Sequence, residues 1–166
     1  MKKYIIVSII TIFAAAAASA QARQPSTAIR PVLVKSKQSL EELEKKLSTE
    51  NKVEELIGGA GMETRVAIQH DKSKNGDPAE LHDKSDDVYY VLKGEATLEL
   101  GGTLIEPKEI SPGEWRSPKV NGSKNFVIKA GDLVMVPRGT PHRRTVTGKG
   151  FSMILIKIFE DPLPAK

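Results

Sequence analysis

The predicted fold depends most on residues 80–94, which read ELHDKSDDVYYVLKG. Glu80 and His82 stand two residues apart, so on an extended strand both side chains leave the same face. Asp87 begins a second, apolar run that ends at the turn residue Gly94. Three side chains that can bind a metal ion therefore meet across one short loop.

A second stretch, residues 131–142, reads GDLVMVPRGTPH. A Gly-Asp turn, an apolar run and a Pro-x-Gly turn follow one another, and together they place His142 at the start of a further strand. His142 is thus a fourth candidate ligand.

The two stretches resemble the paired motifs of the cupins, small β-barrels whose motifs bring metal ligands into the barrel. The usual first motif is Gly, five residues, His-x-His, three or four residues, Glu, six residues, Gly. His82 takes the second His position, Asp87 the Glu position and Gly94 the last Gly, whereas Glu80 stands where the first His would be. The leading Gly is displaced, because Lys74 occupies its position.

The usual second motif is Gly, five residues, Pro-x-Gly, two residues, His, three residues, Asn. Gly131, Pro137, Gly139 and His142 fit it without a gap, and Val146 replaces the Asn. The resemblance covers about residues 63–159. It implies an all-β fold, an antiparallel cupin barrel of jelly-roll type with six to eight strands.

The resemblance also implies that Glu80, His82, Asp87 and His142 hold one divalent metal ion, with one or two positions left open. The commoner cupin shell has three His and one Glu. Two carboxylates cancel the charge of a divalent ion, so its bound water should be acidified less than in the commoner shell. Mixed, oxygen-rich ligands favour Mn or Fe, with Ni or Zn as alternatives. An ordinary polar cluster on a wet strand edge is the competing interpretation.

Two functions stay open at this point. The protein is either an enzyme, similar to the metal-dependent cupin dioxygenases and isomerases, or a non-catalytic cupin that binds a small oxygenated molecule or serves a structural role without metal. The candidate catalytic residues are Tyr89 and Arg144, whose strand parity points them into the barrel, and Arg144 is a candidate for binding an anionic group. His70 is better explained as a strand-end histidine, and Lys157 as an edge lysine that reaches water.

The N-terminus predicts a secretory signal peptide over residues 1–20. Lys2 and Lys3 precede a short apolar run, and small residues favour cleavage after Ala20 or Ala22. The run is too short for a convincing membrane span. A secreted or periplasmic protein without stable membrane association after cleavage is expected. The chain has no cysteine, which excludes disulfides and thiol catalysis.

The charge balance indicates a small-molecule ligand rather than nucleic acid. The chain has 25 basic and 21 acidic residues, and removal of Lys2 and Lys3 leaves 23 against 21, a net charge of +2. No basic block or aromatic-interleaved stripe stands out, so nucleic acid is not an expected partner.

The remaining sequence predicts a simple order of segments. Ser39 and Glu42 form a capping box that begins one helix, and Asn51 begins a second short helix that ends at Gly58. The expected segments are a linker or arm (21–38), a helical cap (39–60), the barrel (61–160) and a tail (161–166).

Two further features concern the surface of the barrel. The last predicted strand, Phe151–Phe159, is apolar at nearly every position, so both of its faces should be covered, by a helix or by a homodimer contact. Trp115 lies in an insertion of residues 102–129 between the motifs, where it would close the pocket, form a dimer contact or anchor the loop.

Overall fold

The computed structural model describes residues 24–164. Residues 24–34 belong to one unit and contain no helix or strand, and residues 35–164 belong to a second unit that holds every helix and strand described. The predicted signal peptide and its cleavage sites lie outside the described residues. Within residues 24–164, no helix has the length and apolar character needed to cross a membrane.

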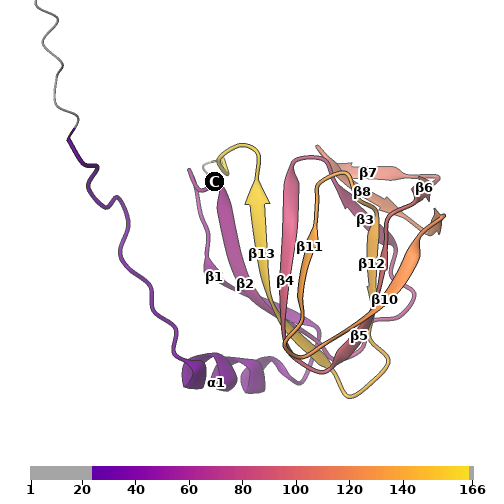
Figure 1. Cartoon of the computed structure of the whole chain (residues 1–166), viewed down its shortest axis with the longest axis horizontal. Helices are drawn as coiled ribbons and strands as arrows, with labels where there is room; N and C mark the ends of the chain where they lie inside the picture. Colours follow the sequence, from indigo (N-terminus) through magenta and orange to yellow (C-terminus); the bar gives the residue numbers. More distant parts are fainter. Residues whose placement is uncertain (1–23, 165–166) are drawn as a thin grey trace, which may run out of the picture. The chain divides into compact units, whose positions relative to one another are not determined.

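Two antiparallel sheets form the second unit (Figure 1). The first sheet has the strand order β1 (Lys52–Ile57), β2 (Thr64–Asp71), β13 (Phe151–Phe159), β4 (Ser85–Lys93) and β11 (Leu133–Val136). The second has the order β10 (Lys124–Lys129), β5 (Glu95–Leu100), β12 (His142–Thr145), β3 (Ala79–His82), β8 (Glu114–Ser117) and β7 (Lys108–Ser111). A small third sheet pairs β6 (Thr103–Ile105) with β9 (Lys119–Asn121). The predicted all-β, antiparallel class is confirmed.

The hydrophobic core lies between the two large sheets. Strand β4 alternates as its sequence predicts, so that Tyr89 and Val91 are buried with Asp87 while Tyr90 faces outward. Leu98 from the opposite sheet packs into the same core. This alternation gives Asp87 the same direction as the core side chains, toward the interior of the barrel.

Gly94, the last residue of the first motif, connects β4 to β5. Its φ is +78°, a conformation that favours glycine, and a Cβ at this position would meet the backbone of Gly150. Both constraints explain why the tight turn after β4 uses glycine.

One helix, α1 (Lys37–Leu47), packs on the flank of the first sheet. Its N-cap is Ser36, whose hydroxyl accepts a hydrogen bond from the Ser39 amide at 3.1 Å, so the helix begins earlier than the predicted capping box at Ser39. Leu47 is fully buried, and Glu44 forms an ion pair with Lys93 at 3.2 Å. The prediction of a short helix near the N-terminus is confirmed.

The prediction of a second helix beginning at Asn51 was wrong. Residues 52–57 form β1, which pairs antiparallel with β2. The Asn51 side chain accepts hydrogen bonds from the amides of Lys72 and Ser73 at 2.8 and 3.2 Å, so it fixes a turn of the neighbouring segment rather than a helix N-terminus. Backbone pairing with β2 overrides the local helical signal.

The insertion between the motifs folds into strands. Strands β6 and β10 lie at its two ends, and the segment between them folds into β7, β8 and β9. Strand β8 pairs with β3, the strand that carries Glu80 and His82. The insertion therefore extends the sheet that carries the candidate metal ligands.

Candidate metal site

Neighbouring strands of the second sheet deliver the candidate ligands. Strand β12 pairs with β3 through His142 and Glu80, and His82 lies two residues further along β3. The Pro-x-Gly turn of the second motif also contacts the first motif, because the Gly139 amide donates a hydrogen bond to the His82 carbonyl at 2.8 Å. Two motifs about fifty residues apart are thus joined by backbone contacts at the site.

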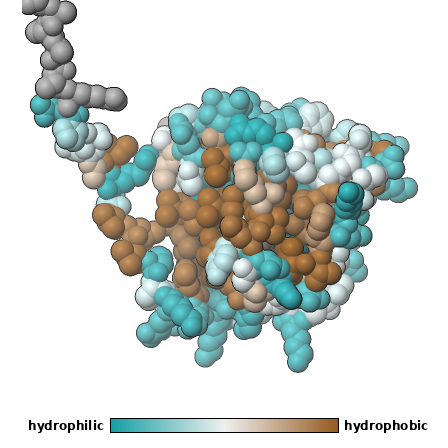
Figure 2. Space-filling view, in the orientation of Figure 1, coloured by the Kyte–Doolittle hydropathy of each residue, from teal (hydrophilic) through white to brown (hydrophobic). Residues whose placement is uncertain are grey.

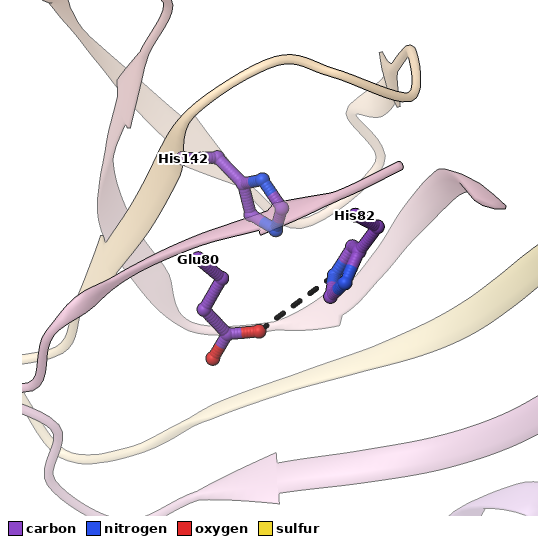
Figure 3. Close-up of side chains that lie close together, drawn as sticks. All are labelled: Glu80, His82 and His142. Carbon is purple, nitrogen blue, oxygen red and sulfur yellow. Dashed lines mark ion pairs between the residues drawn. The ribbon is translucent and has the colours of Figure 1, made fainter. Parts of the chain in front are cut away.

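Glu80, His82 and His142 point toward one another inside the barrel (Figure 3). One potential ligand atom from each lies within 4.8 Å of the others, and Glu80 Oε2 is 3.8 Å from His82 Nε2. Atoms bound at ~2.1 Å to one ion lie about 3.0 to 3.4 Å apart, so closure around an ion requires only small shifts. The two motifs meet inside two antiparallel sheets with their ligands convergent. The predicted cupin fold is confirmed.

Hydrogen bonds orient both imidazoles toward the centre of the cluster. His82 Nδ1 lies 2.6 Å from Glu114 Oε2, and His142 Nδ1 lies 3.0 Å from the Thr140 carbonyl oxygen. Both partners accept hydrogen bonds, so each Nδ1 carries the proton and each Nε2 has a free lone pair. Among the described residues, His82 Nε2 is buried without a hydrogen-bond partner. A buried, unpaired acceptor is costly unless a ligand such as a metal ion satisfies it.

Asp87, the fourth predicted ligand, lies beside this cluster. Its Oδ2 is 3.6 Å from His82 Nε2 and 3.8 Å from His142 Nε2, and it accepts a hydrogen bond from the Tyr89 hydroxyl at 3.2 Å. Its Oδ1 lies 2.5 Å from Lys157 Nζ. The interpretation of Lys157 as an edge lysine reaching water was wrong, because β13 lies between β2 and β4 and the side chain is largely buried.

The charge states of the cluster suit metal binding. Burial alone would raise the pKa of Asp87, but the groups around it, among them the Lys157 ammonium in contact with Oδ1, outweigh burial and lower the pKa to about 2. Burial likewise opposes ionisation of Glu80, yet Arg116 and the other positive charges nearby lower its pKa. Burial lowers the pKa of His142 below its ordinary value. The acids are ionised and His142 is neutral at pH 7, which are the forms that bind metals.

The two candidate catalytic residues both line the interior. Arg144 is buried, as its strand parity predicts, and binds Asp71 through two nitrogens at 2.7 and 2.8 Å. Its guanidinium also lies 5.6 Å from the ring centres of Tyr89 and Phe151. Burial, followed by the Asp87 charge, raises the pKa of Tyr89 well above its ordinary value, so Tyr89 stays a neutral phenol that donates to Asp87.

The cavity beside the cluster is small, with a volume of about 80 Å³. Its lining includes Glu80, Asp87, His142, Tyr89, Arg144 and Lys157, together with Gln69, Lys74 and Arg143.

Two residues that the sequence analysis considered for this site lie outside the cavity. His70 is a buried residue near the end of β2 that bonds Ser152 at 2.8 Å, as the strand-end interpretation predicts. Trp115 lines a separate shallow pocket and donates to Asp83 at 2.8 Å, so it does not close this cavity.

Two residues that support the ligands were not predicted from the sequence. Glu114 and Arg116 leave the same face of β8, and Arg116 lies 3.5 Å from Glu80 and 3.8 Å from Glu114. Glu114 is 32 residues from His82 in the chain, in an insertion with no motif of its own. Only the pairing of β8 with β3 brings these side chains together.

No family model matches the chain, and no curated protein matches it. Solved structures that resemble it include DMSP lyase DddQ from Ruegeria pomeroyi DSS-3, with 17% identity over 72% of this chain and 53% of that chain and a TM-score of 0.49. An oxalate oxidase has 20% identity over 68% and 53%, with a TM-score of 0.48. An uncharacterized conserved protein with a double-stranded β-helix domain from Klebsiella pneumoniae has 17% identity over 69% and 82%, with a TM-score of 0.48. The chain spans about half the length of the first two.

Proposed function

We propose that the protein is a metal-binding cupin in which Glu80, His82, His142 and Asp87 hold one divalent ion, and in which the ion presents an open position to a small oxygenated molecule. The observation that carries the proposal is His82 Nε2, which is buried among ligand-type side chains and has no hydrogen-bond partner in the described structure. The hydrogen bond between His82 Nδ1 and Glu114 orients the ring so that the Nε2 lone pair points toward the cluster.

Asp87 completes the proposed ligand set from the opposite sheet. Lys157 holds its Oδ1, which leaves Oδ2 directed at both imidazole Nε2 atoms. Two carboxylates and two imidazoles favour Mn or Fe, with Ni or Zn as alternatives. When bound, such an ion supplies Lewis acidity and, for iron or manganese, a centre for oxygen chemistry.

The cavity supports a very small, anionic ligand. A volume of about 80 Å³ corresponds to the liquid share of roughly three water molecules. Arg144 and Lys157 are already paired with the buried carboxylates of Asp71 and Asp87. Lys74 also lines the cavity, but its ion-pair partner is the half-exposed Asp77 at 3.5 Å, so Lys74 can turn to a ligand. A molecule with one carboxylate and a few heavy atoms fits these constraints.

A second candidate function is capture of this ligand without catalysis. The candidate catalytic residues and their neighbour Lys157 are engaged by the protein itself: the Tyr89 hydroxyl and the Lys157 ammonium contact Asp87, and Arg144 contacts Asp71. This arrangement favours binding over acid–base catalysis. In either function we place the mature protein outside the cytoplasm, on the strength of the basic and apolar N-terminal sequence.

Metal content tests the proposal directly. The protein, purified without chelators or a His-tag, is expected to carry Mn, Fe, Ni or Zn in near-stoichiometric amount. Added back to metal-free protein at a hundredfold excess over its Kd, the ion should stabilise the fold by about 2.7 kcal/mol and raise Tm by roughly 5 to 10 °C. Protein that carries no metal and whose Tm does not respond to any of the four ions would contradict the proposal.

The ligand class is tested by replacing Lys74. Lys74→Gln removes a charge-assisted contact worth about 1.5 to 3 kcal/mol, so it should weaken acetate binding roughly 10- to 100-fold while metal affinity is kept. Acetate binding to the cobalt-loaded protein is measured by visible absorption. Lys72→Gln, which removes an exposed lysine two residues away, is the matched control. Equal acetate affinity in both variants would overturn the anionic-ligand proposal and leave the metal site unaffected.

A further inference from the structure

Within residues 35–164, the outward face of the first sheet is apolar and largely uncovered. Figure 2 shows a continuous hydrophobic band over β2, β13, β4 and β11. On this face Leu133 is 71% exposed, Met135 57%, Tyr90 47% and Ile158 38%. The outward side of an antiparallel sheet that faces water normally carries polar residues. A different surface is therefore expected to cover this one.

The strand register makes the exposed residues one surface rather than scattered positions. Leu133 lies beside Tyr90, and Met135 lies beside Val88 on the neighbouring strand. Ile156 of β13 lies between Val88 on one side and Val66 on the other. The rows through Tyr90 and through Val88 cross four strands without a charged side chain, and Asp86 lies beside Ile158 at the rim. We call this surface the apolar face, and its outward residues are Val66, Val88, Tyr90, Leu133, Met135, Ile154, Ile156 and Ile158.

Helix α1 covers only one end of the sheet. Between the helix and β4 an open groove of about 870 Å³ remains, lined by Leu40 from the helix and by Tyr90 and Leu92 from the strand. The groove continues the apolar face through Tyr90. In the part of the chain from residue 35 to 164, helix α1 therefore leaves the centre of the face for another partner.

Two charged pairs at the rim form within the chain. Lys93 pairs with Glu44 at 3.2 Å, and Asp86 binds Arg138 through both carboxylate oxygens. At these positions a charged partner would meet a charge that is already paired. The face instead suits a second apolar face of the same character, as homodimer interfaces are the more apolar class.

We propose that the apolar face binds the same face of a second copy of this chain in a two-fold symmetric dimer. Strands about 4.8 Å apart and alternate residues about 6.7 Å apart give the face a footprint of roughly 400 Å². A polar rim around such a centre reaches the ~600 to 800 Å² per partner that stable interfaces bury. The chain without Lys2 and Lys3 has a net charge of +2, so charge repulsion opposes self-association only weakly.

Sedimentation and light scattering test the dimer. Wild-type protein is expected to be dimeric at micromolar concentration, and the Leu133→Glu/Met135→Glu variant, which buries two charges in the interface, is expected to be monomeric. Val127→Glu, at a 62% exposed site on the other large sheet, is the matched control and should stay dimeric.

Circular dichroism and metal content show whether the variants are folded. A monomeric wild type at 100 μM, or a folded double variant that remains dimeric, would overturn the proposal. Neither result bears on the metal site, which lies on the inner side of the barrel.

Discussion

Replacing His142 by alanine is expected to abolish stoichiometric metal binding. His142 offers an Nε2 lone pair that no other residue of β12 replaces, and the remaining ligand atoms come from β3 and β4. Loss of supporting contacts alone costs about 10- to 100-fold in metal affinity, so loss of a ligand should exceed this range. Metal content after dialysis and competition with a chelator measure the effect, and His82→Ala should behave in the same way.

The matched control removes the third histidine of the chain. His70 is buried on β2 and bonded to Ser152 rather than to the cluster, so His70→Asn should lose some stability and keep its metal. If His142→Ala retained stoichiometric metal in a folded state, or if His70→Asn lost metal as completely, the assignment of the ligands would be wrong.

A partial loss of metal affinity on replacing Glu114 would distinguish a metal site with supporting residues from a chance cluster of ligand-type side chains. Glu114→Gln keeps a hydrogen-bond acceptor for His82 Nδ1 but removes the charge that increases the basicity of the ring. Metal affinity should fall by about 10- to 100-fold without loss of the fold. Glu95→Gln, at an exposed strand position, should leave the affinity unchanged. Equal affinities in the two variants would show that Glu114 does not support the metal.

The sequence predicted the parts of the site that depend on local spacing. The two-residue separation of Glu80 and His82 places both on one face of β3, and the turn at Gly139 brings His142 to the start of β12. Strand alternation likewise predicted the inward direction of Asp87 and Arg144. Each of these features follows from the geometry of a single strand or turn.

The features that the sequence missed depend on which strands become neighbours. Lys157 was misjudged because its environment depends on the central place of β13 in the sheet. Glu114 reaches His82 only through the pairing of β8 with β3, and Asn51 caps a turn of a neighbouring segment rather than a helix. The residues of each contacting pair lie 21 to 70 positions apart in the chain, so no local sequence pattern predicts the contact.

Breaking the ion pair between Asp71 and Arg144 is expected to produce the largest loss of stability. Asp71 belongs to β2 in the first sheet and Arg144 to β12 in the second, so the pair joins the two sheets beside the cavity. Both side chains are buried. Asp71→Asn leaves the largely buried guanidinium without its counter-charge. The expected cost is about 3 to 5 kcal/mol, which lowers Tm by roughly 10 °C.

The double variant Asp71→Leu/Arg144→Met separates the penalty of a buried, unpaired charge from the contribution of the pair itself. Apolar side chains of similar volume can replace a buried ion pair at little cost, so the double variant should be more stable than Asp71→Asn. Thermal and urea unfolding measure both. If the single and double variants were equally unstable, the loss would come from packing around Tyr89 and Phe151 rather than from the charge.

The same variants connect stability to the metal site. Asp87 is the one proposed ligand on the first sheet, whereas Glu80, His82 and His142 all belong to the second. A weaker contact between the sheets should therefore loosen the approach of Asp87 and leave the other three ligands in place. Asp71→Asn is expected to lower metal affinity less than His142→Ala does, and a loss as complete as in His142→Ala would mean that the spacing of the sheets, rather than the ligands of one sheet, determines whether the ion binds.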